Sequence, residues 1–317
     1  GDQNIAAELE SLGICFFAVS NLEEALSLRR HGVAGEILVL GPTPWRRAGD
    51  LAKYNIIQTV HSLPYAESLS RQAARDGVTV RAHLKLDTGM GRIGFVIRED
   101  FDPRPEIRQA VALPGLRMEG VFSHFSSADD ITEAGEDYTA LQRVRFDRTV
   151  KALEAEGIRF SCHHLQNSAG IENERDCHYD YVRAGIILYG MPVDTKEGCA
   201  LPLQPVLSIR SVVTMVKSPG GGTPASYGRH YVTPDERVIA TVPIGYADGY
   251  LRCMGGKASV LIHGRRAKVV GSVCMDQIMV GVTGIPDVKE DDIVTIVGRD
   301  GEEEVTFDEL AGYAGTI

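Results

Sequence analysis

The stretch HLKLDTGMGRIGF, from His83 to Phe95, decides the fold of this chain. It begins as a strand with alternating apolar residues and breaks into a tight turn rich in glycine. Side chains two residues apart on a strand share a face, so Lys85 and Asp87 are expected on one face. Gly89 and Gly91 tolerate backbone conformations that a Cβ atom resists, which lets the turn close around a ligand.

Lys85 stands at the centre of this strand, and the strand looks buried. A buried ammonium group is costly unless it is neutralised or modified. The alternative is a surface lysine paired with Asp87. Arg92, just past the two glycines, adds a second cation to the same segment.

Short apolar strands alternate with amphipathic helices over the first two-thirds of the chain, which is typical of βαβ units and a parallel sheet. The predicted strands are Phe16–Ser20, Ile37–Gly41, Ile56–Val60, Arg81–Asp87, Glu119–His124, His163–Asn167 and Val182–Tyr189. The predicted helices between them are Leu22–His31, Trp45–Tyr54, Tyr65–Asp76, Pro105–Val111 and Gly135–Gly157. This set is one strand short of a (β/α)8 barrel.

The chain opens with a predicted helix, Gln3–Leu12, whereas a βα fold starts on a strand. We therefore expect the first barrel strand to lie upstream of Gly1. After Leu201 the pattern changes to strand-like segments, which predicts a smaller, mostly β domain. The predicted domains are residues 1–201 and 202–317, each incomplete at its outer end.

Composition excludes several classes of function. A formal net charge of −10 over 317 residues argues against a nucleic-acid-binding protein. No apolar run approaches the roughly 18 residues that a membrane span requires. The six cysteines form no CxxC pair, so they are predicted to be reduced thiols of a cytoplasmic protein. The pair His163–His164 has no ligand at metal-binding spacing, and no metal is predicted.

Barrels of this kind carry their chemistry at the carboxyl ends of the strands. The predicted strands place several polar residues at that rim: Lys85 to Arg92, His124, Asn167, Ser168, Arg183 and Gly185. Their shared placement predicts an active site.

Seven motifs follow one another along the chain: LKLDTGMGRIGF, FSHFSSAD, HLQNSAG, VRAGIILYG, ASYGRHY, PIGYADGY and GSVCMDQ. In this order they resemble motifs of the alanine racemase family. Ala184 stands where the family usually has proline. The resemblance implies a pyridoxal-phosphate (PLP) enzyme with a barrel, a β domain and active sites shared across a homodimer.

Racemisation removes the α-proton of an amino acid and returns one to the opposite face. It calls for two acid/base groups, with PLP as the electron sink. The resemblance implies that one is the lysine that holds PLP as a Schiff base, expected upstream of Gly1, and that Tyr227, from the partner subunit, is the other. A free tyrosine titrates near pH ~10, so nearby groups must help it, and the resemblance places His124 beside it and Arg183 beyond.

The resemblance also assigns roles to other residues. Arg183 faces the PLP ring nitrogen and keeps it unprotonated; a structural salt bridge with Asp180 is the alternative. Lys85 matches a lysine that is often carbamylated, which orients Arg92 towards the substrate carboxylate or the tyrosine oxygen. The remaining contacts to PLP or substrate fall on Asn167, Ser168, Gly185, Ile186, His124, Met275 and Tyr246. For Met275 and Tyr246, a place in the β-domain core is the alternative.

Together these residues predict a cytoplasmic bacterial racemase that interconverts L- and D-alanine for peptidoglycan synthesis. One alternative is the serine racemase domain of a larger, membrane-anchored glycopeptide-resistance protein. A PLP-dependent decarboxylase of basic amino acids is a second, although the SYG and CMDQ motifs argue against it. A non-catalytic PLP-binding protein is a third, if the Schiff-base lysine is truly absent.

Overall fold

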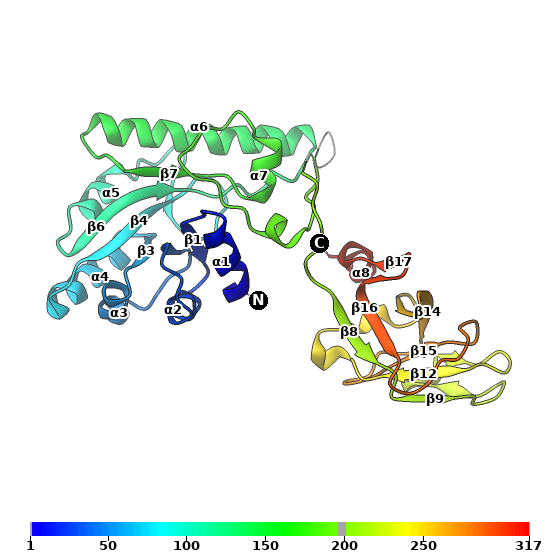
Figure 1. The fold of residues 1–317 in the computed structure, drawn as a ribbon. Helices are drawn as coiled ribbons and strands as arrows, with labels where there is room; N and C mark the ends of the chain where they lie inside the picture. Colours follow the sequence, from blue (N-terminus) through cyan, green and yellow to red (C-terminus); the bar gives the residue numbers. More distant parts are fainter. Residues whose placement is uncertain (1, 196–200, 317) are drawn as a thin grey trace. The chain divides into compact units, whose positions relative to one another are not determined.

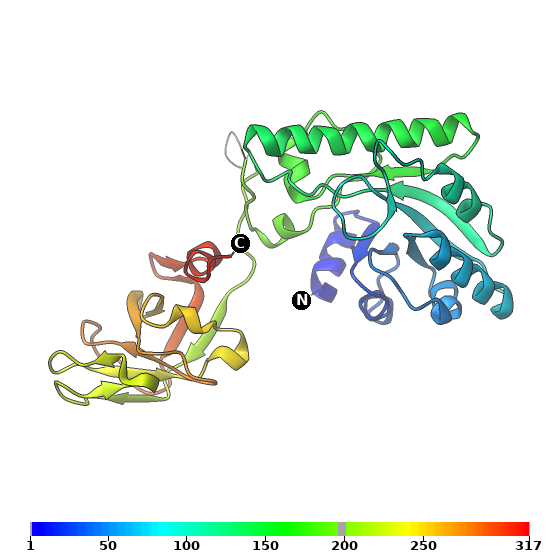
Figure 2. The same cartoon turned by 180° about the vertical axis from the view of Figure 1, so that it is seen from behind.

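The computed structural model describes residues 2–195 and 201–316. They form two compact units, Gly1–Leu203 and Gln204–Ile317, and each unit is described by itself. The first unit is α/β and the second is mostly antiparallel β. Figure 1 and Figure 2 show the two units from opposite sides.

The first unit is built on a parallel sheet whose neighbouring strands follow the chain order. The strands are β1 (Phe16–Val19), β2 (Glu36–Val39), β3 (Ile56–Val60), β4 (Val80–Asp87), β6 (Leu116–Phe122) and β7 (Cys162–His164), with β5 (Phe95–Val96) paired to β4. The helices are α1 (Asp2–Ser11), α2 (Leu22–Arg30), α3 (Ala48–Lys53), α4 (Leu63–Asp76), α5 (Arg104–Val111), α6 (Glu133–Ala155) and α7 (Ser168–Asn173). The sheet curls, with helices on its outside (Figure 1), and confirms the predicted (β/α)-barrel class.

The two faces of this sheet have different chemistry. Leu84 and Leu86 of β4 pack with the apolar side chains of the helices in the main core. The alternate residues point the other way, into the curl of the sheet. There a small apolar cluster of Leu38, Ile57 and Phe122 shares the interior with buried polar side chains. A polar interior at the carboxyl end of a barrel is where an active site is expected.

The predicted strand Val182–Tyr189 is wrong. An isolated parallel bridge to His164 involves Tyr181, just before the segment, and the segment itself ends in a 3-10 helix over Ile186–Tyr189. The amide of Gly185 donates to the side-chain oxygen of Ser168, so it is not available to a strand ladder. The other predicted strands and the opening helix are confirmed, with small shifts of their ends, and Trp45–Tyr54 divides into a 3-10 turn and α3.

The second unit holds an antiparallel sheet in the order β17-β16-β13-β14-β15-β12-β9, with β8 paired to β16, and a separate hairpin of β10 and β11. The bounds are β8 (Ile209–Val212), β9 (Met215–Lys217), β10 (Pro224–Ala225), β11 (Tyr231–Val232), β12 (Ile239–Val242), β13 (Ser259–Ile262), β14 (Arg265–Val270), β15 (Ile278–Gly281), β16 (Ile293–Asp300), β17 (Glu303–Val305) and α8 (Phe307–Ala314). Short 3-10 helices cover Tyr227–Arg229, Tyr246–Asp248 and Arg252–Met254. This architecture confirms the predicted mostly β second part.

Two further expectations concern the whole chain. Among the described residues, no helix is both long and apolar enough to cross a membrane. The cysteines that the structure describes carry free thiols, and Cys199 lies outside the described residues.

Gly94 sets the distance between β5 and β4. Its φ is +129°, and a Cβ atom there would lie 2.7 Å from the amide nitrogen of Asp87 and 3.0 Å from the carbonyl oxygen of Lys85. Backbone atoms cannot move aside as a flexible side chain can, so position 94 requires glycine.

We therefore expect Gly94→Ala to lower the free energy of unfolding by about 1–3 kcal/mol. The matched control is Gly49→Ala within α3, where the nearest neighbour of the added methyl group is an ordinary 3.5 Å contact. That control should keep or raise stability, by up to about 0.5–1 kcal/mol, because alanine has a higher helix propensity than glycine. Urea unfolding of both variants measures the difference, and equal stabilities would contradict the close approach.

Candidate active site

The turn after β4 is held by Asp87. Its Oδ1 accepts hydrogen bonds from the amides of Gly89 (3.1 Å) and Gly91 (3.0 Å). Both glycines have positive φ, +143° and +72°, as the sequence predicts for this turn. From α6, the Tyr138 hydroxyl donates to the carbonyl of Gly89 at 2.8 Å. The turn is therefore fixed at its centre and on its outer side.

Lys85 lies inside the barrel with 3% of its surface exposed, so the surface interpretation is wrong. Its Nζ donates to the carbonyl of Leu86 at 2.7 Å and lies 5.4 Å from the centre of the Phe122 ring. Burial lowers the pKa of Lys85 to about 7; the carboxylate of Asp87 opposes this shift, and the charges of Arg183 and Arg92 add to it. Neutral and protonated amine therefore coexist near neutral pH.

Arg183 is a cation whose acceptors are neutral. Its Nη2 donates to the carbonyls of Ser123 (2.6 Å) and Leu165 (2.8 Å), and its Nη1 donates to Nδ1 of His164. The salt bridge with Asp180 is wrong, because that carboxylate accepts from the backbone amide and the ring of His163. Burial lowers the pKa of Arg183 to about 9. Its Nε is buried and has no hydrogen-bond partner.

His124 lies beside this guanidinium, with Nδ1 3.3 Å from Nη2 of Arg183. Arginine only donates, so Nδ1 of His124 accepts and the ring proton sits on Nε2. Burial lowers the pKa of His124 to about 3, assisted by the charges of Arg183, Arg92 and Lys85. Arg92 itself is exposed. The structure thus brings Lys85, Arg92, His124 and Arg183 together.

The second group of predicted residues comes from two segments. Asn167 and Ser168 lie at the start of α7, and Gly185 and Ile186 follow Arg183 in the chain. Asn167 caps α7 by accepting from the amide of Gly170 at 2.9 Å. The Ser168 hydroxyl accepts from the amide of Gly185 at 2.9 Å. Ile186 begins the following 3-10 helix. A hydroxyl and backbone amides at one place are suited to an anionic group.

Three further residues that support this rim, Thr88, Ser123 and Gln142, were not among those predicted from the sequence. The hydroxyls of Thr88 and Ser123 lie 2.8 Å apart, and Ser123 also donates to the carbonyl of Leu86. From α6, Nε2 of Gln142 donates to the carbonyl of His124 at 3.1 Å. Gln142 is fully buried, which a polar residue in a surface helix does not signal. For Thr88 and Ser123, which follow β4 and β6, the alternation of side chains along these strands was the sequence signal that could have located them.

Three loops of the second unit meet through hydrogen bonds. Oγ of Ser226 donates to the carbonyl of Ser272 (2.6 Å), whose hydroxyl donates to the carbonyl of Tyr227 (3.1 Å). The amide of Ala247 donates to the carbonyl of Met275 at 2.8 Å. These bonds present Tyr227 (69% exposed), Met275 (57%) and Tyr246 (40%) on the surface of this unit. The β-domain core interpretation of Met275 and Tyr246 is therefore wrong.

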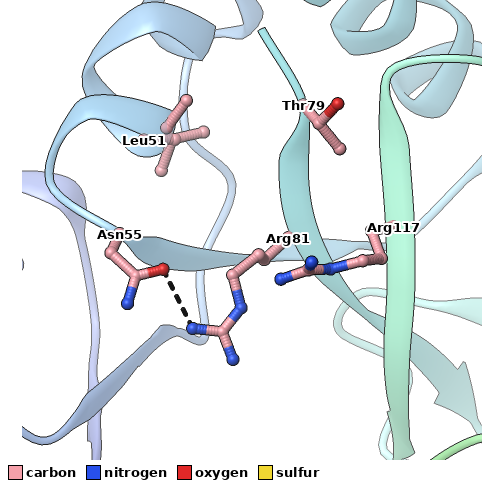
Figure 3. Close-up of a pocket in the computed structure, with 6 residues that line it drawn as sticks. Leu51, Asn55, Thr79, Arg81 and Arg117 are labelled. Carbon is pink, nitrogen blue, oxygen red and sulfur yellow. Dashed lines mark hydrogen bonds between the residues drawn. The ribbon is translucent and has the colours of Figure 1, made fainter.

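A hollow at the opposite, amino end of the sheet has different electrostatics. It is lined by Leu51, Ala52, Asn55, Thr79, Arg81 and Arg117, and Figure 3 shows the two arginines on neighbouring strands. Arg81 pairs with Glu36 and Glu119, and Arg117 pairs with Glu119. Because these arginines are already paired with carboxylates, we assign the chemistry to the rim that holds Arg183.

Comparison with known families agrees with this geometry. Residues 1–192 match the alanine racemase N-terminal domain, and residues 206–317 match the alanine racemase C-terminal domain. The chain belongs to the alanine racemase family.

Individual relatives carry the same name. Alanine racemase 1 of Clostridium acetobutylicum is 39% identical over 100% of this chain and 81% of the relative. The alanine racemase of Desulforamulus reducens is 42% identical over 96% of this chain and 80% of the relative. The chain is therefore an amino-acid racemase of the alanine racemase type, and the decarboxylase and non-catalytic alternatives are set aside.

Solved structures extend the comparison. The alanine racemase of Clostridium difficile 630 has a TM-score of 0.90 and 36% identity, over 100% of this chain and 81% of that one. A histidine racemase from Leuconostoc mesenteroides has a TM-score of 0.86 and 30% identity, over 99% of this chain and 82% of that one. The same fold therefore serves amino acids of different size.

The residue before Tyr227 is strained. Ser226 has φ 67° and ψ 176°, a region that is occupied almost only by glycine and costs on the order of 1–3 kcal/mol. The bond from its hydroxyl to Ser272 holds it there.

We expect Ser226→Ala to lose about 1 kcal/mol of stability, because the bond is lost and the strain remains. Ser226→Gly loses the same bond but relieves the strain, so it should be more stable than Ser226→Ala by about 1 kcal/mol. Chemical unfolding checks the order. Glycine ordinarily lowers stability relative to alanine, so a less stable Ser226→Gly would refute the strain.

Proposed function

We propose that the chain is a PLP-dependent racemase that interconverts L- and D-alanine. The observation that carries the proposal is the half-buried side chain of Arg183, which has no carboxylate partner among its hydrogen bonds and a buried, unpartnered Nε. PLP, when bound, supplies the sink for the electrons left by the departing α-proton. Nε–H of Arg183 would donate to the ring nitrogen and keep it unprotonated, because an arginine retains its proton at neutral pH.

In this proposal residues 1–201 hold the cofactor. Asn167, Ser168, Gly185 and Ile186 would bind its phosphate, with the Ser168 hydroxyl as a donor, since it accepts from the amide of Gly185 and keeps its own proton free. The proposal is supported by the bond that already joins Ser168 to Gly185, because it brings both segments to one place.

We further propose that residues 202–317 supply Tyr227 as one of the two acid/base groups. The tyrosine would act on one face of the substrate, with Met275 and Tyr246 closing over it. The proton on Nε2 of His124 can be donated to a phenolate oxygen, which favours the deprotonated form. The exposure of Tyr227 and Met275 supports an assignment in which a second copy of the chain completes each site. The enzyme would then be a homodimer that makes D-alanine for peptidoglycan in the cytoplasm.

Lys85 has a separate proposed role as a carbamate. The neutral amine attacks carbon dioxide, a nitrogen–carbon bond forms, and one proton leaves to solvent. The side chain thereby changes from cation to anion and orients Arg92 towards the substrate carboxylate or the tyrosine oxygen. The lowered pKa of Lys85 supports this, because it leaves the nucleophilic amine available near pH 7.

Substrate choice is tested with the complete protein and PLP. We expect D-alanine to be racemised with a higher kcat/KM than D-serine; the relatives described above do not favour the serine alternative. The reverse order would overturn the substrate assignment.

Tyr227→Phe tests the two-base arrangement in heavy water. We expect racemisation to fall by about 10²–10⁴-fold, because one proton donor is lost. One enantiomer of alanine should still exchange its α-proton without inversion, since the other predicted base, the lysine that holds PLP, is intact. Tyr231→Phe, on β11 of the same hairpin, is the matched control and should keep full activity. Equal loss of exchange from both enantiomers would argue against Tyr227 as a one-sided base.

Carbamylation is tested by 13C NMR after equilibration with labelled bicarbonate. We expect a carbamate resonance that is lost in Lys85→Arg and kept in Lys53→Arg, an exposed control. The signal should grow from about pH 6 to about pH 8, because the neutral amine increases as pH rises through a lysine pKa of about 7. A spectrum with no resonance, or one that survives in Lys85→Arg, would rule the carbamate out.

A further inference from the structure

Three buried side chains beneath the rim have no role in the chemistry above. They are His83, Cys162 and His164, and all three point into the barrel. Strand register places His83 level with Gly120 and Cys162. The next inward row holds Lys85, Phe122 and His164.

Because Gly120 of β6 has no side chain, side chains of β4 and β7 come into contact across β6. A methyl group at position 120 would lie 2.6 Å from Sγ of Cys162 and 2.7 Å from Cε1 of His83. Without it, the imidazole of His83 reaches over β6 to both Cys162 and His164. The missing side chain is therefore a condition for the contacts that follow.

The hydrogen bonds form a chain with one possible direction. Nη1 of Arg183 can only donate, so Nδ1 of His164 accepts and its proton lies on Nε2. Nε2 of His164 then donates to Nδ1 of His83 over 3.1 Å. The proton of His83 consequently lies on its Nε2, which faces Sγ of Cys162 at 3.7 Å. Each tautomer is fixed by the one before it.

The protonation states agree with this chain. Burial lowers the pKa of His83 to about 4 and that of His164 well below its ordinary value, with the charge of Arg183 acting on both. Each ring therefore carries one proton at neutral pH, as a directed chain of donors and acceptors requires.

We propose that His83 is a positioning residue for the active site. It accepts the proton of His164 and so keeps Nδ1 of His164 free to hold Arg183. Without this acceptor, His164 can take the other tautomer, which would turn an N–H against the N–H of Arg183 and break the bond. The effect on PLP rests on the proposed function, whereas the tautomer of His164 is a property of the chain itself.

A metal ion is the competing explanation of the same cluster. One ligand atom from each of His83, Cys162 and His164 lies within 4.8 Å of the others, and nitrogen with sulfur suits Zn²⁺. Two observations argue against it. Arg183 donates to Nδ1 of His164, and a guanidinium in contact with the ring opposes a second cation there. Burial also raises the pKa of the Cys162 thiol to about 11, which disfavours the thiolate that a metal needs.

Two variants of similar size separate the roles of the His83 nitrogens. In His83→Asn, the amide oxygen replaces Nδ1 as the acceptor for His164. In His83→Gln, the amide lies near the place of Nε2 and that acceptor is lost. Cys162→Ala removes only the last and longest contact, so it is the matched control.

The first measurement is 15N NMR of the histidine rings in the complete protein without PLP. We expect a single Nε2–H tautomer of His164 in the wild type, His83→Asn and Cys162→Ala, and a mixture in His83→Gln. An unchanged tautomer in His83→Gln overturns the proposal. So does a wild-type protein that retains stoichiometric zinc bound to these rings.

The second measurement is the dissociation constant for PLP, with the absorbance spectrum of the bound cofactor. We expect His83→Gln to weaken binding by about tenfold to a hundredfold, the cost of losing a hydrogen bond to a charged group. His83→Asn should restore binding to within about threefold of the wild type, since the acceptor is kept. Equal binding by both variants would overturn the positioning role. A wild type that fails to bind PLP would instead contradict the proposed function, and the NMR result would still decide the tautomer.

Discussion

The structure depends on the positive charge of Arg183, a half-buried side chain whose hydrogen bonds to the described residues include no carboxylate. Burying an ion is costly unless polar groups replace its water. For Arg183 those groups are the carbonyls of Ser123 and Leu165 and the ring of His164. Dipoles lower the cost of burial but leave the net charge in place. The rim therefore stays electropositive, which is the property that the proposed cofactor and a carboxylate substrate would require.

This charge also fixes the states of its neighbours. It lowers the pKa values of His124, His164 and Lys85, although burial is the larger cause in each case. The amino end of the same sheet provides the contrast, because Arg81 there is paired with two carboxylates. One sheet thus carries a neutralised end that stabilises the fold and a charged end that is available for chemistry.

Much of the fold was predictable from the sequence, and so were several residues of the candidate site. Apolar periodicity is local, so the strands from Phe16 to His164 and the helices between them could be located. The segment Val182–Tyr189 could not, because the amide of Gly185 is taken by Ser168, which lies far back in the chain. The role of His83 was hidden for a related reason. It depends on Gly120 being level with it on the neighbouring strand, and register is a property of the folded sheet.

The two units hold different parts of the proposed active site. The first holds cations around Arg183 and no tyrosine assigned to the chemistry. The second presents Tyr227 and Met275 to solvent on loops held in place by hydrogen bonds from the Ser272 hydroxyl and the Ala247 amide. A phenol in water is a poor base at neutral pH, because an ordinary tyrosine has a pKa near ~10. In the proposed homodimer the cations of one site would stabilise the phenolate that meets it. Assembly would then be a condition for catalysis, since the proposed base Tyr227 and the cations around Arg183 belong to different units.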